Sequence, residues 1–498
     1  SLNASLVTDD HRAGLYVFGQ NRHRDAYDHD GDGYSEMPKL KNQTVGFRSF
    51  LKTSTYSKLT FEYHHLQEFR RGGNMLNRPP HEADIAEQIQ HSINGGGLKF
   101  DYFAPNEKHR LTLYTSAQHT DRDSYYGSKK DLNAYGKTTD LTFIGGSQYV
   151  YSFDKCLFMP ADLTAGLEYN RDNLKDDMWG YNRYTKQTVN IGSAFFQNEW
   201  KNEKWSILLG GRLDKHNLIN HVIFSPRANL RFNPTQDVNL RLSYSSGFRA
   251  PQAFDEDLHI ENVGGTVSMI ERAKNLKEEK SQSFSASADM YHRFGAFQVN
   301  FLVEGFYTKL SDVFVLENIG ERDGILIKER RNGSGAKVLG LSMEGKMAYL
   351  SLFQLQAGVT LQQSRYDEPE KWSETAPAQK KIFRTPNTYG YFTATYTPVK
   401  PLSVSLSGTY TGSMLVQHMA GYIKNDIAVN TRDFFDMGVK LAYDFKLYKT
   451  IDLQLSAGVQ NVFNAYQNDF DQGVERDSGY IYGPAAPRSY FAGVKISY

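Results

Sequence analysis

The last nine residues of the chain, Tyr490-Phe-Ala-Gly-Val-Lys-Ile-Ser-Tyr498, carry an apolar residue at every second position. This apolar face consists of Tyr490, Ala492, Val494, Ile496 and Tyr498, whereas the other face is mostly small or polar. A period of two with a terminal aromatic residue is typical of a strand between lipid and a wet lumen. An edge strand of a soluble sandwich has the same period, so this segment alone leaves both interpretations open. In a barrel, Tyr490, Val494, Ile496 and Tyr498 would form the membrane-inserting face of the C-terminal strand.

The same alternation recurs along the chain, in segments 238–245, 402–410 and 451–460 among others. In 402–410, leucine, valine, glycine and tyrosine alternate with serine and threonine. In 238–245 and 451–460, the second face carries charged and amide side chains, which a dry sandwich core would not accept unpaired. These side chains need water or a polar filling, so the pattern favours a large barrel over a sandwich.

The composition of the 498 residues agrees with a membrane barrel and excludes several other classes. No run of 18 apolar residues exists, which excludes a membrane-spanning helix, and the mean hydropathy of −0.57 does not exclude alternating strands. The 32 Tyr and 31 Phe residues suit aromatic girdles at the membrane interfaces. A net charge of +1 gives no indication of a nucleic-acid partner, and the single Cys156 excludes an internal disulfide.

Short and long connections alternate between these segments. Residues 105–108 and 202–204 are examples of short connections, and residues 22–40, 119–138 and 170–187 of long ones. Bacterial outer-membrane barrels combine short periplasmic turns with long extracellular loops in this way, and their strand count is usually even. We therefore predict an all-β fold in which residues 1–498 form a large antiparallel transmembrane β-barrel of about 22 strands. About 21 strands are readable in this chain, and one ascending strand is expected upstream of Ser1.

Several segments closely resemble the barrel of TonB-dependent outer-membrane transporters, and their order and spacing over residues 160–498 make the resemblance specific. One of them reads Leu240-Arg-Leu-Ser-Tyr-Ser-Ser-Gly-Phe-Arg-Ala-Pro251. The others are residues 166–169, 196–200, 210–214, 225–227, 275–281, 460–464 and 483–498. The resemblance implies that Arg249, Pro251, Asn461 and Phe463 are structural residues, with Arg249 paired to a nearby carboxylate on the lumen wall.

The resemblance also implies a function. Members of this family actively import a scarce, bulky nutrient across the outer membrane of Gram-negative bacteria, powered by the TonB energy-transducing complex. Nothing in residues 1–150 resembles the plug domain or the energy-coupling box of the family, so both are expected to be absent from this chain. The expected partners are outer-membrane lipid, TonB and a small-molecule metal chelate. The alternative is a passive porin-like channel or a structural barrel that partners surface lipoproteins.

The segment Asp28-His-Asp-Gly-Asp-Gly-Tyr-Ser-Glu36 resembles the first half of an EF-hand calcium loop. Its alternating carboxylates predict a calcium site formed by Asp28, Asp30, Asp32 and Glu36. The segment is not an EF-hand, because Lys39 stands where that loop carries its last glutamate, and a solvated acidic loop is the alternative. Cobalamin transporters of the family order early loops with calcium through similar segments. The resemblance therefore implies cobalamin as the first substrate candidate, with a ferric siderophore or haem close behind.

A flat or macrocyclic ligand would need aromatic side chains in the extracellular loops. The candidates for such contacts are Tyr125, Tyr126, Trp179, Tyr181, Tyr184, His418 and Tyr422. The same aromatic residues could instead form the upper aromatic girdle. A single loop histidine, such as His81, His259 or His418, could cap a haem iron together with a tyrosine.

Enzymatic activity is not expected. Barrel phospholipases and proteases need a Ser–His or Asp–His constellation, and no spacing in the chain distinguishes a nucleophile. The sequence also shows no phosphate-binding loop, no HExxH motif and no Cys/His cluster. We expect a structural calcium ion but no redox cofactor.

Overall fold

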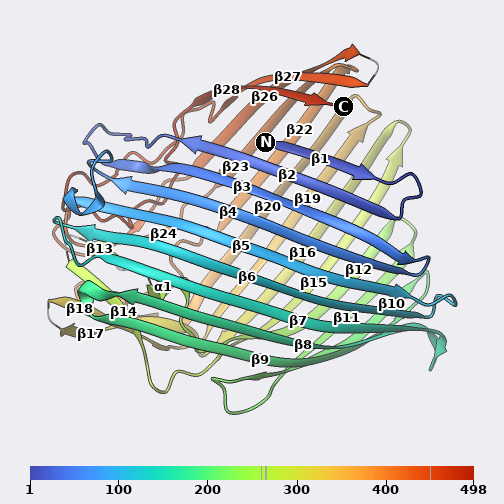
Figure 1. The fold of residues 1–498 in the computed structure, drawn as a ribbon, viewed down its shortest axis with the longest axis horizontal. Helices are drawn as coiled ribbons and strands as arrows, with labels where there is room; N and C mark the ends of the chain where they lie inside the picture. Colours follow the sequence, from blue (N-terminus) through green and yellow to red (C-terminus); the bar gives the residue numbers. More distant parts are fainter. Residues whose placement is uncertain (259–260, 264–265, 323, 449) are drawn as a thin grey trace.

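The computed structural model describes residues 1–258, 261–263, 266–322, 324–448 and 450–498. Antiparallel pairing between neighbouring strands joins 22 of them into one sheet (Figure 1). The strands of this sheet are β1 (Leu2–Val7), β2 (Ala13–Arg24), β3 (Ser35–Ser54), β4 (Ser57–Gly73), β5 (Ile85–Phe103), β6 (His109–Ser128), β7 (Tyr135–Cys156), β8 (Met159–Met178), β9 (Arg183–Lys201), β10 (Trp205–His216), β11 (Ile223–Thr235), β12 (Val238–Arg249), β15 (Glu279–Phe294), β16 (Phe297–Ser311), β19 (Ala336–Tyr349), β20 (Phe353–Glu370), β21 (Gln379–Lys381), β22 (Thr388–Val399), β23 (Leu402–Thr411), β26 (Phe434–Tyr448), β27 (Ile451–Gln460) and β28 (Ser489–Ser497).

The predicted all-β class and antiparallel barrel sheet are confirmed. Of the 22 strands, β21 is only three residues long and pairs with the end of β20. The remaining strands follow the chain, and they agree with the count of about 21 expected from the alternation. Within the described residues, β1 and β28 are the edges of the sheet, with pairing to β2 and β27 respectively. Direction alternates from one antiparallel strand to the next, and an odd number of long strands lies between β1 and β28. The two edge strands therefore run in the same direction.

The membrane-facing surface is clearest on β16. Its outward positions hold Phe297, Val299, Phe301, Val303, Gly305 and Tyr307, so one aromatic residue lies at each end of an apolar row. Phe297, Phe301 and Tyr307 are largely exposed, which is the expected state of apolar side chains that face lipid. The row from Phe297 to Tyr307 matches the nine to eleven residues that a tilted strand needs to cross a bilayer.

The opposite face of the sheet carries many polar residues, as the alternation predicts, although on β16 it also holds Leu302, Phe306 and Leu310. On β15, β16, β19 and β20, the residues Ser287, Glu304, Ser342 and Thr360 lie side by side in register. The hydroxyl oxygens of Ser342 and Thr360 are 2.9 Å apart. Neighbouring polar side chains on this face can therefore satisfy one another across the strands.

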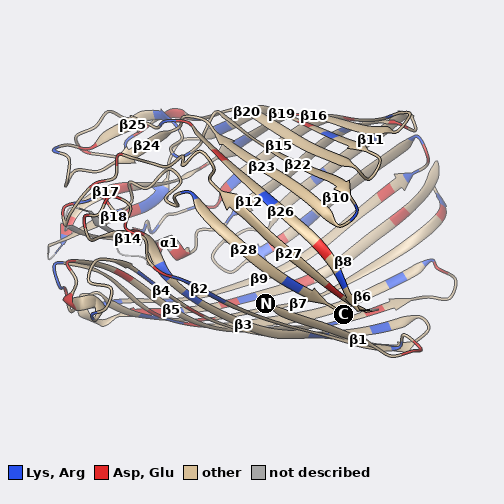
Figure 2. Cartoon of the chain, turned by 90° about the horizontal axis from the view of Figure 1, so that it is seen from above, with Lys and Arg blue, Asp and Glu red and all other residues tan. Residues whose placement is uncertain are grey.

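Long connections gather at one end of the barrel, which we call the mouth, and several of them fold into small elements (Figure 2). Four strands form a second sheet, hereafter the mouth sheet. These are β13 (Glu261–Val263), β14 (Thr266–Arg272), β17 (Phe314–Arg322) and β18 (Ile325–Asn332). The remaining elements are a hairpin of β24 (Leu415–His418) and β25 (Ile427–Asn430), the helix α1 (Asp255–Leu258), and the 3-10 turns η1 (Pro80–Glu82) and η2 (Trp179–Tyr181).

Several predicted loops are in fact strand. The expected loop 119–138 shortens to 129–134, because β6 continues to Ser128 and β7 begins at Tyr135. The expected loop 170–187 likewise shortens to 179–182, between β8 and β9. These strands contain 19 to 22 residues, more than a bilayer requires, so their upper halves form a wall above the membrane. Charged and aromatic residues in this wall resemble loop residues in sequence.

Within the described residues, no helix is both long and apolar enough to cross a membrane.

The two faces of the sheet predict opposite responses to a new charge. Val303→Arg places a cation in the middle of the lipid-facing row on β16, and we expect it to cost about 2–4 kcal/mol of unfolding free energy. Ser287→Arg places the same cation on the lumen face beside Glu304, and we expect a cost below about 1 kcal/mol. Reversible urea unfolding in lipid vesicles measures both values. Equal costs would contradict the assignment of the faces.

Candidate functional site

The mouth sheet packs against the inner side of the extended wall (Figure 2). Met269 of β14 and Ile327 of β18 form a buried cluster with Tyr126 of β6 and Met178 of β8. The α1 segment follows the same wall, because the Arg122 guanidinium donates a hydrogen bond to Asp255 at 2.6 Å. The loops of the mouth are thus folded inward and held by both apolar and ionic contacts.

A pocket of about 810 Å³ lies between the mouth sheet and the connection from β8 to β9. Its lining includes five cationic residues and two acidic ones. The cationic residues are Arg183, Lys186, Arg272, Lys274 and Arg322, and the acidic ones are Asp257 and Glu271. The pocket therefore has an excess of positive charge.

Ion pairs neutralise only part of this charge. Arg322 pairs with Glu271 at 2.8 Å, and Asp257 accepts a hydrogen bond from Arg330 at 3.0 Å. Lys186 and Lys274 are both exposed in the pocket, where they can meet a ligand without first breaking a buried contact. An anion that enters this space meets two flexible ammonium groups, one from the start of β9 and one from the connection that follows β14.

Two of the seven predicted ligand-binding residues, Tyr181 and Tyr184, line this pocket. Tyr184 is 59% exposed. Tyr181 is partly buried and its hydroxyl donates a hydrogen bond to the Asp131 carboxylate. Burial and this carboxylate together raise the pKa of Tyr181 above its ordinary value, so the phenol stays protonated.

The other five predicted ligand residues lie elsewhere at the mouth. Trp179 and Tyr422 are exposed, and a ligand-binding role stays a prediction for both. Tyr125 and Tyr126 are buried, with the Tyr125 hydroxyl bonded to the backbone of Asp131 at 2.9 Å. They are closed to a ligand in this conformation.

His418 is also buried, because it joins two loops of the mouth. Its Nε2 lies 2.9 and 3.0 Å from the carboxylate oxygens of Asp471, and its ring stacks on Tyr480 at 3.6 Å. Asp477 accepts hydrogen bonds from the N–H groups of Met419 and Gly479 beside this pair. Burial raises the pKa of the Asp477 carboxyl above its ordinary value. The cluster connects connection 412–433 to connection 461–488.

The two other histidines considered as haem ligands are His81 and His259. The ring of His81 lies 2.7 Å from the Tyr135 hydroxyl, and His259 lies outside the described residues.

The acidic segment forms the compact connection between β2 and β3. Ligand oxygens of Asp28, Asp30 and Glu36 all lie within 4.8 Å of one another. Oxygens on opposite sides of a calcium ion are separated by about twice its 2.3–2.6 Å bond length, so this spacing fits a shared ion. The predicted fourth ligand, Asp32, lies outside the group.

Asp32 instead contacts the last long connection. Arg476 pairs with Asp32, and its other terminal nitrogen lies 3.1 Å from Glu36. Both carboxylates and the guanidinium are largely buried. The His29 ring packs on Tyr466 at 3.9 Å beside this bridge. Because these loops follow β2 and precede β28, the bridge ties the two edges of the sheet at the mouth.

The family-motif residues take structural positions near the loops. The Arg249 guanidinium lies over the Phe254 ring at 3.8 Å, and its pairing with a carboxylate stays a prediction. The Pro251 carbonyl accepts a hydrogen bond from Arg272 at 3.4 Å. Asn461 is buried, with its amide bonded to the carbonyls of Ala465 and Ala486 at 2.8 and 3.0 Å.

Phe463 and the C-terminal strand face outward. Phe463 is exposed and lies 5.8 Å from Phe435. The apolar face of β28 continues the apolar face of β27 in register. Its predicted membrane-inserting residues Tyr490, Val494, Ile496 and Tyr498 are each at least 69% exposed, and their role in insertion stays a prediction.

Comparison with known proteins decides the family. The model of the family described as "TonB dependent receptor-like, beta-barrel" matches residues 8–462. The chain belongs to the TonB-dependent receptors. The receptor is accordingly an outer-membrane protein that crosses the membrane with many strands. A search of the curated proteins finds no match.

Solved structures of siderophore receptors share the fold of this receptor. The siderophore receptor PirA from Acinetobacter baumannii matches with a TM-score of 0.77 and 15% identity, over 99% of this chain and 76% of that one. A variant of the ferric enterobactin receptor PfeA from Pseudomonas aeruginosa matches with a TM-score of 0.77 and 14% identity, over 99% and 76%. The ferric-catecholate import receptor Fiu from E. coli K12 matches with a TM-score of 0.69 and 13% identity, over 99% and 79%. At these identities the likeness establishes the fold alone.

Sequence reasoning missed the cationic side of the pocket. Lys186 and Lys274 stand in ordinary polar surroundings in the sequence, and they line one pocket only because the mouth sheet folds inward against the end of β9. Sequence reasoning also missed Arg476 and Asp471, which pair with residues 444 and 53 positions away.

We predict that Arg476→Gln loosens the mouth, because it leaves two largely buried carboxylates without their cation. In the presence of a chelator, amide exchange in residues 25–34 and 461–488 should accelerate by at least about tenfold. Hydrogen exchange with mass spectrometry measures the change. Arg488→Gln, an exposed residue of the same connection, is the control. Unchanged exchange in the Arg476 variant would show that the bridge does not hold the loops.

Proposed function

We propose that this receptor imports an anionic iron–siderophore chelate across the outer membrane. The family supports active import, and the single observation that points to the cargo is the cation-rich pocket at the mouth. Ferric chelates of catecholate type carry negative charge, which Lys186 and Lys274 would attract and bind. Transport in this proposal is gated binding and conformational change, without bond chemistry.

The solved receptors that share the fold support this choice of cargo. They include receptors for siderophores, for ferric enterobactin and for ferric catecholates. Cobalamin gains no support from the comparisons. Haem loses one candidate ligand, because His418 is buried, its Nε2 is held by Asp471 and its ring is covered by Tyr480.

Energy would come from TonB through a plug, which we propose lies in a part of the receptor outside residues 1–498. The chain spans 76–79% of the length of the solved relatives. The parallel direction of β1 and β28 also supports a further strand between them, since an antiparallel barrel can close only through a strand that opposes both. A porin-like channel or a scaffold for surface lipoproteins remains the competing function.

The lysine pair offers a direct test of the cargo. In the full-length receptor, Lys186→Gln with Lys274→Gln should weaken binding of ferric enterobactin by at least about tenfold, since each lysine makes a charge-assisted contact. Quenching of tryptophan fluorescence measures the affinity, with cyanocobalamin and haemin as competing probes.

Lys129→Gln with Lys424→Gln removes the same charge from exposed loop positions outside the pocket and serves as the control. We expect this control to bind like the parent receptor. Saturable, tight binding of cyanocobalamin with no binding of the ferric chelate would overturn the proposed cargo.

We also propose that Asp28, Asp30 and Glu36 bind a structural calcium ion. The donor set fits, because all three supply the hard oxygen ligands that calcium prefers and their oxygens lie within 4.8 Å of one another. The sharp turn needed for this spacing uses Gly31 and Gly33, whose φ angles are +77° and +89°. Arg476 contacts one member of the group, Glu36, at 3.1 Å, and its other terminal nitrogen pairs with Asp32 outside the group.

Calcium should stabilise the receptor through this loop. At a concentration one hundredfold above the dissociation constant, binding to the folded state alone contributes about 2.7 kcal/mol. Asp28→Asn with Asp30→Asn should abolish this gain and the accompanying rise in melting temperature. Asp32→Asn should keep it, because Asp32 lies outside the group. Calorimetric titration and thermal unfolding decide the question, and identical stability in calcium and in chelator would exclude the site.

A further inference from the structure

Four cationic side chains stand side by side on the outer surface of the barrel. Lys309 on β16 is the register partner of Lys337 on β19, Lys337 is the partner of Arg365 on β20, and Arg365 is the partner of Lys381 on β21. All four residues are exposed. They share the outward face of their strands with Tyr307, which ends the apolar row two residues below Lys309. We call them the basic row.

The basic row is electrostatically unfavourable without a partner. Neighbouring strands lie 4.7–4.9 Å apart, and like charges directly opposite one another destabilise a sheet. Within the described part of the chain, an ion pair reaches only one member of the row, Lys337, whose Nζ lies 3.5 Å from Asp367. The row therefore creates a strip of positive charge immediately above the membrane-facing surface. Such a strip is complementary to an anion at the height of the lipid headgroups.

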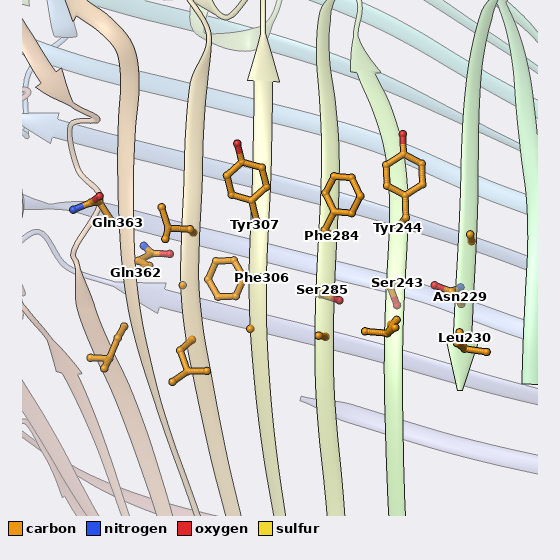
Figure 3. A pocket seen from close by; sticks show the side chains of 18 of the residues that line it. Asn229, Leu230, Ser243, Tyr244, Phe284, Ser285, Phe306, Tyr307, Gln362 and Gln363 are labelled. Carbon is orange, nitrogen blue, oxygen red and sulfur yellow. The ribbon is translucent and has the colours of Figure 1, made fainter. Parts of the chain in front are cut away.

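An apolar hollow of about 1200 Å³ lies on the same outer face, and its lining residues Tyr307, Leu339 and Gln363 are each two positions from a member of the basic row. Figure 3 shows side chains that line the hollow. Small residues form part of its floor, namely Ala228, Ala286 and Gly305. A Cβ atom added at Gly305 would meet no atom within 4 Å, so the floor is open to the outside. Figure 3 shows Tyr244, Phe284 and Tyr307 side by side on three neighbouring strands at its upper edge.

The hollow belongs to the surface that the receptor presents to the membrane. Leu242 and Leu341, both exposed, line it together with Phe284. No charged residue lines it. The hollow is therefore surrounded by the hydrocarbon of the membrane. It leaves room for an acyl chain that enters between the aromatic rings. Apolar space and positive charge are stacked along the membrane normal, separated by about two residues of strand.

We propose that this outer wall binds an acylated, phosphorylated lipid of the outer leaflet. An acyl chain fills the hollow, and the phosphate accepts hydrogen bonds from the basic row. Phosphate oxygens form charge-assisted hydrogen bonds with lysine and arginine, which relieves the repulsion among the four cations. The occupant is a lipid because the hollow continues the lipid-facing surface without a break. The site is separate from the pocket at the mouth and does not depend on which chelate the receptor imports.

The test measures binding of bisphosphorylated lipid A to the full-length receptor in detergent by native mass spectrometry. The test variant removes the basic row and consists of Lys309→Gln, Lys337→Gln, Arg365→Gln and Lys381→Gln. The control variant removes the same charge from exposed turns and consists of Lys129→Gln, Lys130→Gln, Lys400→Gln and Lys424→Gln. We expect the test variant to bind at least about tenfold more weakly and the control to bind like the parent.

Two further arms separate the phosphate from the acyl chain. Dephosphorylated lipid A should bind the parent receptor as weakly as lipid A binds the test variant. Gly305→Phe fills the hollow from a position with open space, and it should weaken lipid A binding without changing ferric enterobactin binding. Heat-modifiable gel mobility verifies that each variant is a folded barrel. Equal binding of lipid A by the parent and the test variant, or full binding by Gly305→Phe, would overturn the proposal.

Discussion

In a bilayer, every backbone N–H and C=O group must find a partner within the protein, because hydrocarbon offers none. This constraint explains the long antiparallel ladder from β1 to β28 and the period of two along each strand. Once the ladder is formed, successive side chains along each strand point alternately to the lipid and to the lumen. The apolar row from Phe297 to Tyr307 and the polar residues Ser287 and Glu304 are the two consequences of one hydrogen-bonding requirement.

The mouth depends on the same ladder, since several strands continue beyond the membrane as a wall. This wall supports the mouth sheet through Met269 and Ile327, so Lys186 of β9 and Lys274 of the connection after β14 line one pocket. Elsewhere at the mouth, Arg476 joins the loops next to the two edges of the sheet. The proposed ligand pocket and this bridge therefore use different segments and different ionic contacts. A change at one of them need not disturb the other.

Most of the fold could be predicted from the period-two alternation of the sequence. The strand ends and ion pairs that could not be predicted depend on contacts between residues far apart in the chain. Alternation in 402–410 and 451–460 correctly indicated strands, because one buried or lipid-facing side leaves a local signal. Strand ends were wrong in 119–138, where polar and aromatic wall residues look like loop residues. The acidic segment identified three clustered carboxylates, but the pairing of Asp32 with Arg476 has no local signature. The basic row is equally invisible without the register, since a slip of one residue would reverse its face.

The central claim is that the cation-rich mouth captures an anionic iron chelate for energised import. The most direct measurement is uptake of radioactive iron from ferric enterobactin by cells in which the full-length receptor is the sole outer-membrane receptor. The account predicts saturable uptake that stops when the proton-motive force is dissipated, and that falls when Lys186 and Lys274 are replaced by glutamine. Uptake that is unsaturable and indifferent to the proton-motive force would contradict the account and indicate a passive channel.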